Sequence, residues 1–413
     1  MIIISTPSHM LPKLTIILFL AGLTSIKSLL VVNNFPTQYQ FNSMCIRSSF
    51  SSSAISSHRR YHRRLNTFVL ESVSSSSTSS TKVPNNVGIT KTSTKKKSYL
   101  SVLWRFTRPH TIIGSAVAIP AIHLLAAPTF SDACNLRTIL SITYATIPAL
   151  LMNLYITGLN QITDVDIDKI NKPDLPIAAG DLSIKDATIT VIVSLLLSVV
   201  LGVAIPAFTT GGLNMALGLS AVLGTIYSLS PFRLKRFPLS AAFCIVAVRG
   251  AVINAGFFAH AKVAAFGGTD SIVQYLLTDP RCYLSSAYFA VFGLVIALMK
   301  DVPDIEGDSL SDINSFAVRL GPKSVYRGMH RLLTALFWGI GLSFFRAVVI
   351  TSTNSMAVQM GRIVVGLSAI LAGASVQREA APVDPENSKE VYVLYMHLWK
   401  LFYLSYFLLP LAR

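Results

Sequence analysis

Long apolar runs alternate with short polar loops from about residue 110 to the C-terminus. A helix needs about 20 mostly apolar residues to cross the hydrocarbon core of a bilayer. The runs therefore predict nine membrane-spanning helices, of which the fourth and the eighth are the shortest. Their approximate ranges are 110–128, 138–160, 187–208, 212–229, 238–260, 283–300, 332–351, 362–377 and 391–411. The pattern predicts an all-α membrane protein, a nine-helix bundle embedded in a lipid bilayer.

The chain before this bundle has a different character. Residues 1–30 contain Lys13, an apolar stretch and then small residues, the layout of a secretory signal peptide. Residues 31–98 are rich in Ser, Thr and Arg and nearly free of acid, so we expect a disordered segment similar to a transit peptide. The two together predict a bipartite leader to a plastid (chloroplast) membrane, followed by one domain over 99–413. An ordinary secretory leader with a disordered tail is the alternative.

Composition supports the membrane assignment and excludes a nucleic-acid partner. Hydrophobic residues make up 52% of the chain and charged residues 13%, whereas soluble domains carry about 25% charged residues. The net charge is +16, but residues 1–110 hold 14 of the 35 basic residues and one of the 19 acids. The basic excess therefore belongs mainly to the leader, and the pattern indicates no nucleic-acid groove and no obligate protein partner. Four cysteines without a CxxC pair predict neither disulfides nor zinc.

An acidic stretch follows the second predicted span. It reads NQITDVDIDK over residues 160–169. If the helix continues past the membrane edge, Asn160, Asp164 and Asp168 form one stripe, because residues four apart share a helix face. Asp166 would then point elsewhere, into solvent.

A second acidic stretch, KDVPDIEGD over residues 300–308, follows the sixth span. Asp301, Asp304 and Asp308 are spaced i, i+3 and i+7, which again favours one face. Pro303 can interrupt such a helix, and Gly307 is expected at its end.

Nine spans place both stretches on the side of the membrane that carries most loop Lys and Arg residues. Two carboxylate clusters on one side would repel unless a cation lies between them. Mg²⁺ suits oxygen ligands, commonly one or two carboxylates together with phosphate oxygens. The pattern thus predicts a diphosphate held through Mg²⁺, with Lys300, Lys172, Arg233 and Lys235 as basic partners. The alternatives are solvated loop acids paired with lysines, and a transporter, which should carry acids in mid-helix.

At these motifs the sequence resembles the UbiA-type intramembrane aromatic prenyltransferases. NQITDVDID fits the family pattern NQxxDxxxD, KDVPDIEGD fits KDxxDxxGD, and the resemblance extends over about 99–413. RFTRPHTIIG and DKINKPDLPIAAGDLS are most similar to the plastid homogentisate prenyltransferases. MNLYITGLNQ, KDVPDIEGD and WKLFY favour the phytyl branch, and PIAAGDLS and VRGAVINAGF the solanesyl branch. Phytyl transfer is the favoured interpretation, while Asp174, where plant members have Tyr, keeps an open role.

The resemblance implies Mg²⁺-dependent transfer of a prenyl group from phytyl, geranylgeranyl or solanesyl diphosphate to homogentisate, with decarboxylation. It implies Mg²⁺ ligands at Asp164, Asp168, Asp301, Asp304 and Asp308. It implies catalytic roles for Lys300 and the first four of these acids, and donor or acceptor binding by Asn160, Gln161, Arg108, Lys172, Tyr227, Arg233 and Lys235. Arg108 would hold either a phosphate or the homogentisate carboxylate. Arg249 lies mid-span and should face the bundle interior, for function or for an internal pairing.

Overall fold

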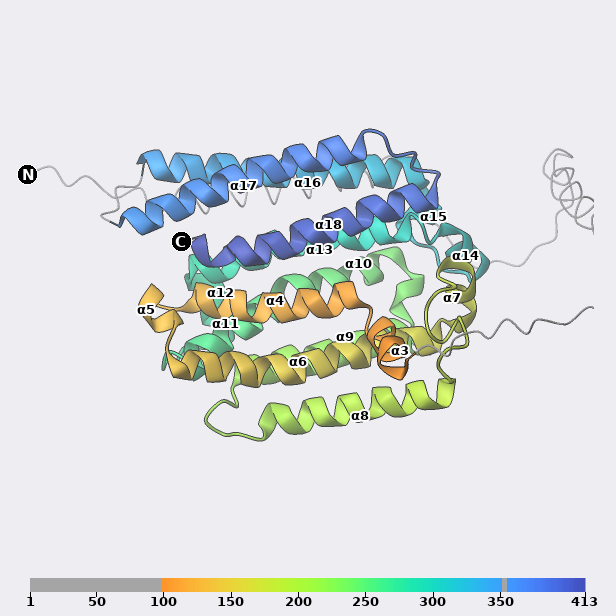
Figure 1. Cartoon of the computed structure of the whole chain (residues 1–413), viewed down its shortest axis with the longest axis horizontal. Coiled ribbons are helices and arrows are strands. Elements are labelled where there is room, and N and C mark those ends of the chain that lie inside the picture. The colour runs from red at the N-terminus through yellow and green to blue at the C-terminus, as the bar shows by residue number, and fades with distance from the viewer. Residues whose placement is uncertain (1–97, 351–354, 413) are drawn as a thin grey trace, which may run out of the picture. The chain divides into compact units, whose positions relative to one another are not determined.

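The computed structural model describes residues 98–350 and 355–412. Within these ranges the chain forms helices and no strands (Figure 1). The first half comprises α3 (Tyr99–Phe106), α4 (Pro109–Ala126), α5 (Phe130–Ala133), α6 (Leu136–Thr163), α7 (Val165–Asn171), α8 (Ile184–Val203), α9 (Gly211–Ser228), η1 (Leu234–Arg236), α10 (Pro238–Val246), η2 (Ala247–Val252) and α11 (Ile253–Ala264). The second half comprises α12 (Ile272–Thr278), α13 (Pro280–Asp301), α14 (Ile305–Leu310), α15 (Phe316–Leu320), α16 (Pro322–Ile350), α17 (Met356–Ala380), α18 (Ser388–Leu408) and η3 (Leu409–Leu411). The predicted leader, residues 1–30 and 31–98, lies outside the described residues except for Ser98.

The predicted all-α membrane class is confirmed, but the count of nine spans is not. Every predicted range overlaps a long helix, and α10, η2 and α11 together form the fifth. Within the described ranges, seven helices are long and apolar enough to cross a membrane. α9 and α18 are not among the seven. Small residues and Asn214 interrupt the apolar run of α9, and His397 and Lys400 interrupt that of α18.

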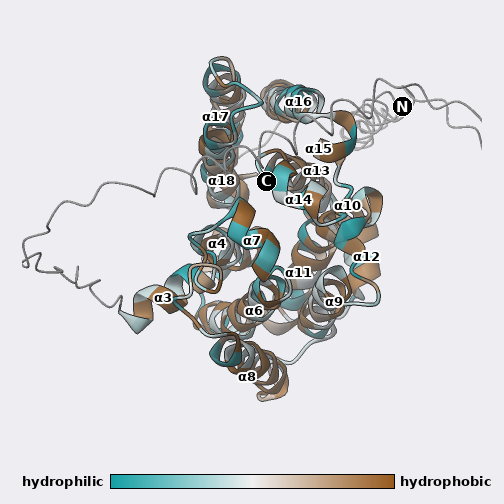
Figure 2. Ribbon diagram, turned by 90° about the vertical axis from the view of Figure 1, so that its right-hand side faces the viewer, coloured by the Kyte–Doolittle hydropathy of each residue, from teal (hydrophilic) through white to brown (hydrophobic). Residues whose placement is uncertain are grey.

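Side-chain caps define where several of these helices begin. Asn135, Ser183, Thr210 and Asp279 each accept a hydrogen bond from a backbone N–H in the first turn of α6, α8, α9 and α13 respectively. Such caps satisfy N–H groups that have no partner inside the helix. The long helices run side by side in Figure 1, and hydrophobic residues cover much of the outer face of α8 in Figure 2.

Small residues and buried hydrogen bonds hold the helices together. A Cβ at Gly212 of α9 would lie 2.4 Å from the carbonyl oxygen of Gly256 in α11, so these two backbones touch. Ser141 of α6 contacts both His123 and His260 through its hydroxyl, at 3.3 and 3.1 Å. Because lipid supplies no hydrophobic force between helices, close packing and such hydrogen bonds stabilise the bundle.

An aromatic cluster packs α13 against α16 and α18. Phe289 stacks on Tyr406 with ring centroids 3.7 Å apart. Phe292 meets Phe337 of α16 and Phe402 of α18 edge to face. Edge-to-face and offset pairs of this kind stabilise beyond the area that they bury.

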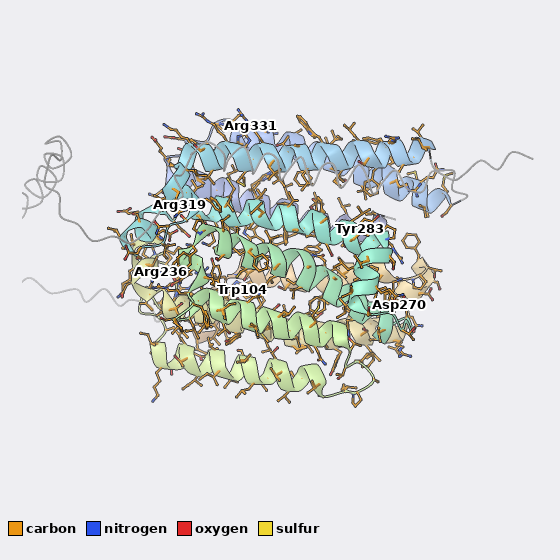
Figure 3. All side chains as sticks on the ribbon, turned by 180° about the vertical axis from the view of Figure 1, so that it is seen from behind. Trp104, Arg236, Asp270, Tyr283, Arg319 and Arg331 are labelled. Atoms are coloured by element: carbon orange, nitrogen blue, oxygen red, sulfur yellow. The ribbon has the colours of Figure 1, made fainter. Side chains whose placement is uncertain are left out.

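Polar loops gather at the two ends of the long helices. Figure 3 shows Arg236 and Arg319 at one end, and Asp270 and Tyr283 at the other. α7 and α14, which contain the second halves of the two acidic motifs, pack against each other at the end where Arg236 lies (Figures 1 and 3). The fold therefore brings the two motifs together, as the sequence predicts.

Candidate active site

The first acidic motif bends at its first aspartate. α6 ends at Thr163, and Asp164 precedes the first residue of α7. The condition for one stripe, a helix that continues through Asp168, is not met, because Asp164 has left the helical conformation with φ at −117°. Its carboxylate accepts a hydrogen bond from Asn160 Nδ2 at 2.8 Å. Asp166 points into solvent as predicted, with a side chain that is 94% exposed.

The second acidic motif has the same layout. α13 ends at Asp301, and Asp304 precedes the first residue of α14. Pro303 lies in the break, which agrees with its expected effect on a helix. Gly307 lies inside α14 and not at its end, so that prediction is wrong.

Asn171 joins the two motifs, and sequence analysis missed it. Its Nδ2 donates to the Asp304 carbonyl at 2.9 Å, and its Oδ1 accepts from the Gly307 N–H at 2.8 Å. A Cβ at Gly307 would lie 2.6 Å from Asn171 Oδ1, so only glycine permits this approach. The spacing offers one signal, because Asn171 lies three residues after Asp168 on a short helix.

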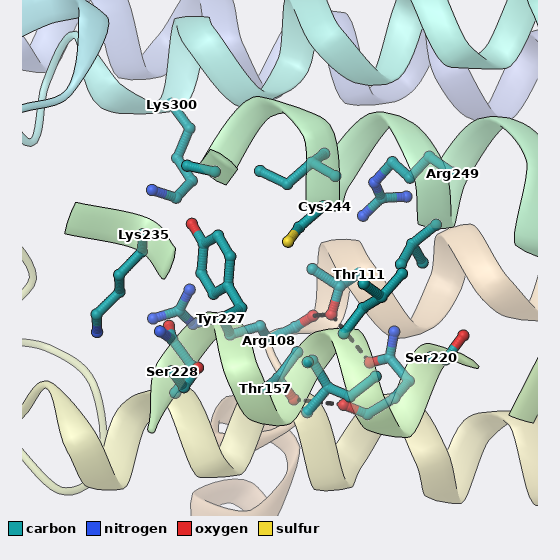
Figure 4. A pocket seen from close by; sticks show the side chains of 18 of the residues that line it. Arg108, Thr111, Thr157, Ser220, Tyr227, Ser228, Lys235, Cys244, Arg249 and Lys300 are labelled. Carbon is teal, nitrogen blue, oxygen red and sulfur yellow. Dashed lines mark hydrogen bonds between the residues drawn. The ribbon is translucent and has the colours of Figure 1, made fainter. Parts of the chain in front are cut away.

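A cavity of about 290 Å³ lies between the helices, and residues of both motifs line it. Its polar end is lined by the predicted residues Arg108, Asn160, Asp164, Asp168, Lys172, Tyr227, Lys235, Lys300, Asp301, Asp304 and Asp308. Figure 4 shows Lys235 and Lys300 at this end, with the Tyr227 hydroxyl directed toward Lys300. The rest of the lining is largely apolar and includes Ile119, Met152, Ile156, Leu217, Leu223, Ile245 and Phe257.

The carboxylate of Asp164 is held by basic side chains from the loop after α9. Lys235 donates a short hydrogen bond to Asp164 Oδ1, and Arg233 Nη2 lies 3.5 Å from the same atom. Burial lowers the pKa of Lys235, and the Asp164 charge opposes that shift. The acids are therefore paired with lysines, but the pairs are buried in the cavity rather than solvated in loops.

Asp304 is paired with Lys172, three residues after the first motif, and with Lys300 of its own motif. Lys172 Nζ lies 2.5 Å from Asp304 Oδ1, and Lys300 Nζ lies 3.3 Å from Oδ2. Lys300 also contacts Asp301 at 3.0 Å. Burial alone would raise the pKa of Asp304, but the two lysine charges and the hydrogen bond from Lys172 outweigh it and lower that pKa. Asp304 is therefore ionised at neutral pH.

Neighbouring positive charges offset the burial of Asp168 and Asp308 less than they offset the burial of Asp304. Burial raises the pKa of Asp168, against the charges of Arg108 and Lys172. Burial, with the neighbouring Asp301 and Asp304, raises the pKa of Asp308 to about 7 although Lys300 opposes the shift. A divalent cation beside these carboxylates would favour their ionised form.

The aspartate oxygens suit a Mg²⁺ ion that keeps some of its water ligands better than a metal ion enclosed by protein ligands alone. Among the described residues, no three His, Cys, Asp or Glu side chains lie close enough to hold a metal alone. Mg²⁺ does not require this, since it commonly uses one or two carboxylates with water and phosphate oxygens. Asp168 Oδ2 is buried without a hydrogen-bond partner, and the nearest cationic group is Arg108 Nη2 at 3.8 Å. This oxygen is free to bind a cation.

Two arginines near the carboxylates have unusual backbones. Arg108 has a φ of 51° and Arg233 has a φ of 38°, in a region of backbone conformation that residues other than glycine rarely adopt. The Nε of each is buried without a hydrogen-bond partner. Strained residues persist where the surrounding structure fixes them, and they cluster at functional sites. Unpaired guanidinium donors at this point suit an anion.

Two predicted residues do not line the cavity. Gln161 is fully buried and donates from Nε2 to the carbonyl of Phe106 at 2.7 Å. This bond ties Gln161 to the end of α3, two residues before Arg108, and its Oε1 is buried without a hydrogen-bond partner. Arg233 reaches the site only through Asp164.

A second polar group inside the cavity was missed as well. Thr111 Oγ1 donates to Asn153 Oδ1 at 3.1 Å, and Asn153 Nδ2 donates to Ser115 Oγ at 3.2 Å. All three line the cavity. The available signal was Asn153 within an apolar span, because polar side chains inside membrane helices usually face the bundle interior.

Comparisons with known proteins identify the family of the chain. The model of the "UbiA prenyltransferase family" matches residues 111–401. Homogentisate phytyltransferase 1, chloroplastic, of Arabidopsis thaliana is 36% identical over 77% of this chain and 78% of its own length. Homogentisate solanesyltransferase, chloroplastic, of the same plant is 34% identical over 76% of each chain. A UbiA homolog from Archaeoglobus fulgidus, solved with DMAPP and Mg²⁺, has a TM-score of 0.48 at 15% identity, over 75% of this chain and 98% of that one. The chain belongs to the UbiA prenyltransferase family.

Proposed function

We propose that the protein transfers a prenyl group, preferably phytyl, from its diphosphate to homogentisate, with loss of the acetate carboxyl as CO₂, a step toward tocopherols. The observation that carries the proposal is a single cavity with five carboxylates and four basic side chains at one end and a largely apolar lining beyond. The charged end suits a metal-bound diphosphate, and the apolar part suits an isoprenoid chain. The relatives named as homogentisate phytyl- and solanesyltransferases support the acceptor.

The basic side chains would act on the leaving group. Lys172, Lys235 and Lys300 line the end where the diphosphate would lie, and Arg108 has an unpaired Nε there. As the C–O bond of the donor breaks, these charges stabilise the diphosphate that departs. Bound Mg²⁺, held by Asp164, Asp168, Asp301, Asp304 and Asp308, would supply further Lewis-acid stabilisation of that charge.

The apolar lining would protect the other product of that cleavage. The allylic carbon left behind is cationic, and water would quench it. Side chains such as Met152, Leu217 and Phe257 exclude water from the space beyond the charged end. The electron-rich homogentisate ring then forms the new C–C bond. The ring carbon that was attacked loses its proton. The methylene carbon of the acetate group of homogentisate gains a proton as the carboxyl leaves as CO₂.

We further propose that the enzyme works in a plastid membrane, supported by the chloroplastic Arabidopsis relative and by seven helices, among the described residues, that suit a bilayer. Fractionation of the organism's plastid membranes, followed by detection of the protein, tests this location. Its presence in the secretory membranes alone would contradict it.

A product assay tests the reaction and the donor together. Membranes carrying the protein are supplied with Mg²⁺, homogentisate and one of phytyl, geranylgeranyl or solanesyl diphosphate, and products are identified by mass. We expect a decarboxylated, prenylated quinol, with the highest kcat/KM for the phytyl donor. A higher value for the solanesyl donor would instead assign the plastoquinone branch, which PIAAGDLS and VRGAVINAGF favour. No product from any donor would contradict the proposed reaction.

A further inference from the structure

Arg249 is a charged residue of the cavity that the proposed diphosphate site does not use. It lies in η2, a π-helical segment in the middle of the span Pro238–Ala264, and it lines the cavity. Figure 4 shows its guanidinium at the end of the pocket away from Lys235. π-helical turns inside α-helices are rare and occur frequently at functional sites, because they redirect a side chain.

Among the described residues, no carboxylate forms an ion pair with Arg249. Its guanidinium lies over the rings of Trp399 and Phe402, whose centroids are 4.8 and 5.4 Å from Cζ. Cation–π contacts offset only part of the cost of a charge held away from water. A guanidinium in this setting is complementary to an anion that enters the cavity.

Packing holds the arginine at this place. A Cβ at Gly293 of α13 would lie 3.0 Å from Arg249 Cβ and 3.2 Å from Cδ, so the arginine stem rests against the glycine backbone. On the next residue, a Cβ at Gly250 would lie 2.6 Å from the Cβ of Ala290. Trp399, on the other side, is 1% exposed. Arg249 is therefore a fixed binding group rather than a surface side chain that reaches in.

The distance to the charged end suits a small aromatic acid. Gly293 precedes Lys300 by seven residues on α13, which corresponds to about 10 Å along the helix axis. A single-ring acid bound at Arg249 would therefore place its ring between Arg249 and the diphosphate end of the cavity. Thr111, Ser115 and Asn153 line the same cavity and supply hydroxyl and amide groups for ring hydroxyls.

We propose that Arg249 binds the carboxylate of the aromatic acceptor and orients the ring toward the prenyl donor. This inference rests on the proposed function and deepens it. It assigns the two cavity arginines separate tasks. Arg108, 3.8 Å from Asp168, belongs to the diphosphate end, and Arg249 belongs to the acceptor.

Replacing Arg249 by methionine tests the assignment, because methionine keeps much of the length and removes the charge. Homogentisate binding is measured by calorimetry on the full chain in lipid nanodiscs, without a prenyl donor. We expect Arg249→Met to weaken it by about 30-fold or more, the loss typical of a charged hydrogen bond. In turnover assays KM for homogentisate should rise similarly, while KM for the prenyl diphosphate stays within about threefold. Arg249→Lys should retain part of the affinity.

An uncharged acceptor separates charge recognition from a general structural effect. 2-Methylhydroquinone lacks the carboxylate, so Arg249→Met should leave its binding within about threefold of wild type. Arg346→Met is the matched control: Arg346 also lies in a candidate span, α16, but does not line the cavity, and homogentisate binding should not change. Equal losses for both acceptors, or unchanged homogentisate binding in Arg249→Met, would overturn the assignment. Failure of the wild-type protein to use homogentisate would instead overturn the proposed function.

Discussion

Asp304→Asn is expected to lower kcat/KM for the prenyl donor by about 100- to 1,000-fold, the range seen when a group stabilising transition-state charge is lost. Asp304 is buried, and its carboxylate contacts Lys172, which follows the first motif, and Lys300 of the second motif. Asparagine keeps the shape but loses the charge that positions both lysines and that would bind the cation. Steady-state turnover of homogentisate with phytyl diphosphate measures the effect.

Asp166→Asn is the matched control for this substitution. Asp166 belongs to the first acidic motif, yet its side chain is 94% exposed and pairs only with Lys169 in the described structure. Such a surface pair contributes little, so activity should stay within about threefold of wild type. Size-exclusion profiles and thermal melting in detergent verify that the Asp304 variant still folds. A folded Asp304→Asn protein with near-normal turnover would remove Asp304 from the site.

Removal of divalent cations is expected to lower the rate of prenyl transfer by more than about 100-fold, since the carboxylates alone would repel a diphosphate. Five aspartates line the polar end of the cavity, and Asp168 Oδ2 has no hydrogen-bond partner to compensate it. Turnover is measured after EDTA treatment and again after Mg²⁺ is returned.

Calcium provides a control for this experiment. Ca²⁺ prefers more ligands at longer distances, so it should restore much less activity than Mg²⁺ at equal concentration. Full activity in EDTA would contradict the assignment of the acidic motifs to a cation.

The positions of the long helices and the meeting of the two acidic motifs were predictable from sequence. Apolar runs determine where helices can enter a bilayer, and both motifs follow such a run directly. Their shared side followed from the distribution of basic loop residues. These features depend on composition over tens of residues, and they do not require knowledge of individual contacts.

The local geometry of the site was less predictable. Helical spacing placed Asp164 and Asp168 on one continuous helix, whereas the chain bends at Asp164 and both carboxylates still face the cavity. Gln161 was expected to face substrate, but it binds a backbone carbonyl of α3. Asn171 bridges segments 133 residues apart in sequence, and its spacing after Asp168 does not identify the partner on the other segment. Such contacts depend on tertiary packing, and tertiary packing routinely overrides local preference.

The membrane-span count shows the same limit. α9 and α18 lie where spans were predicted, yet neither is among the seven helices that are apolar enough on their own. In α18, Trp399 and Phe402 contact Arg249, and His397 contacts Ser375 of α17. Hydrogen bonds between helices require polar residues within an apolar run, and these residues lower the mean hydropathy of that run.

Binding of an unreactive phytyl thiodiphosphate, titrated at fixed Mg²⁺ concentrations, measures most directly whether the two helix ends serve one bound group. The proteins compared are wild type, Asp164→Asn, Asp304→Asn and the double variant. We expect each single change to remove the Mg²⁺-dependent part of binding, and the double variant to bind within about threefold of the weaker single, because coupled residues are not additive. Losses that multiply, or singles that bind as tightly as wild type, would show that the two motifs do not share a magnesium–diphosphate site.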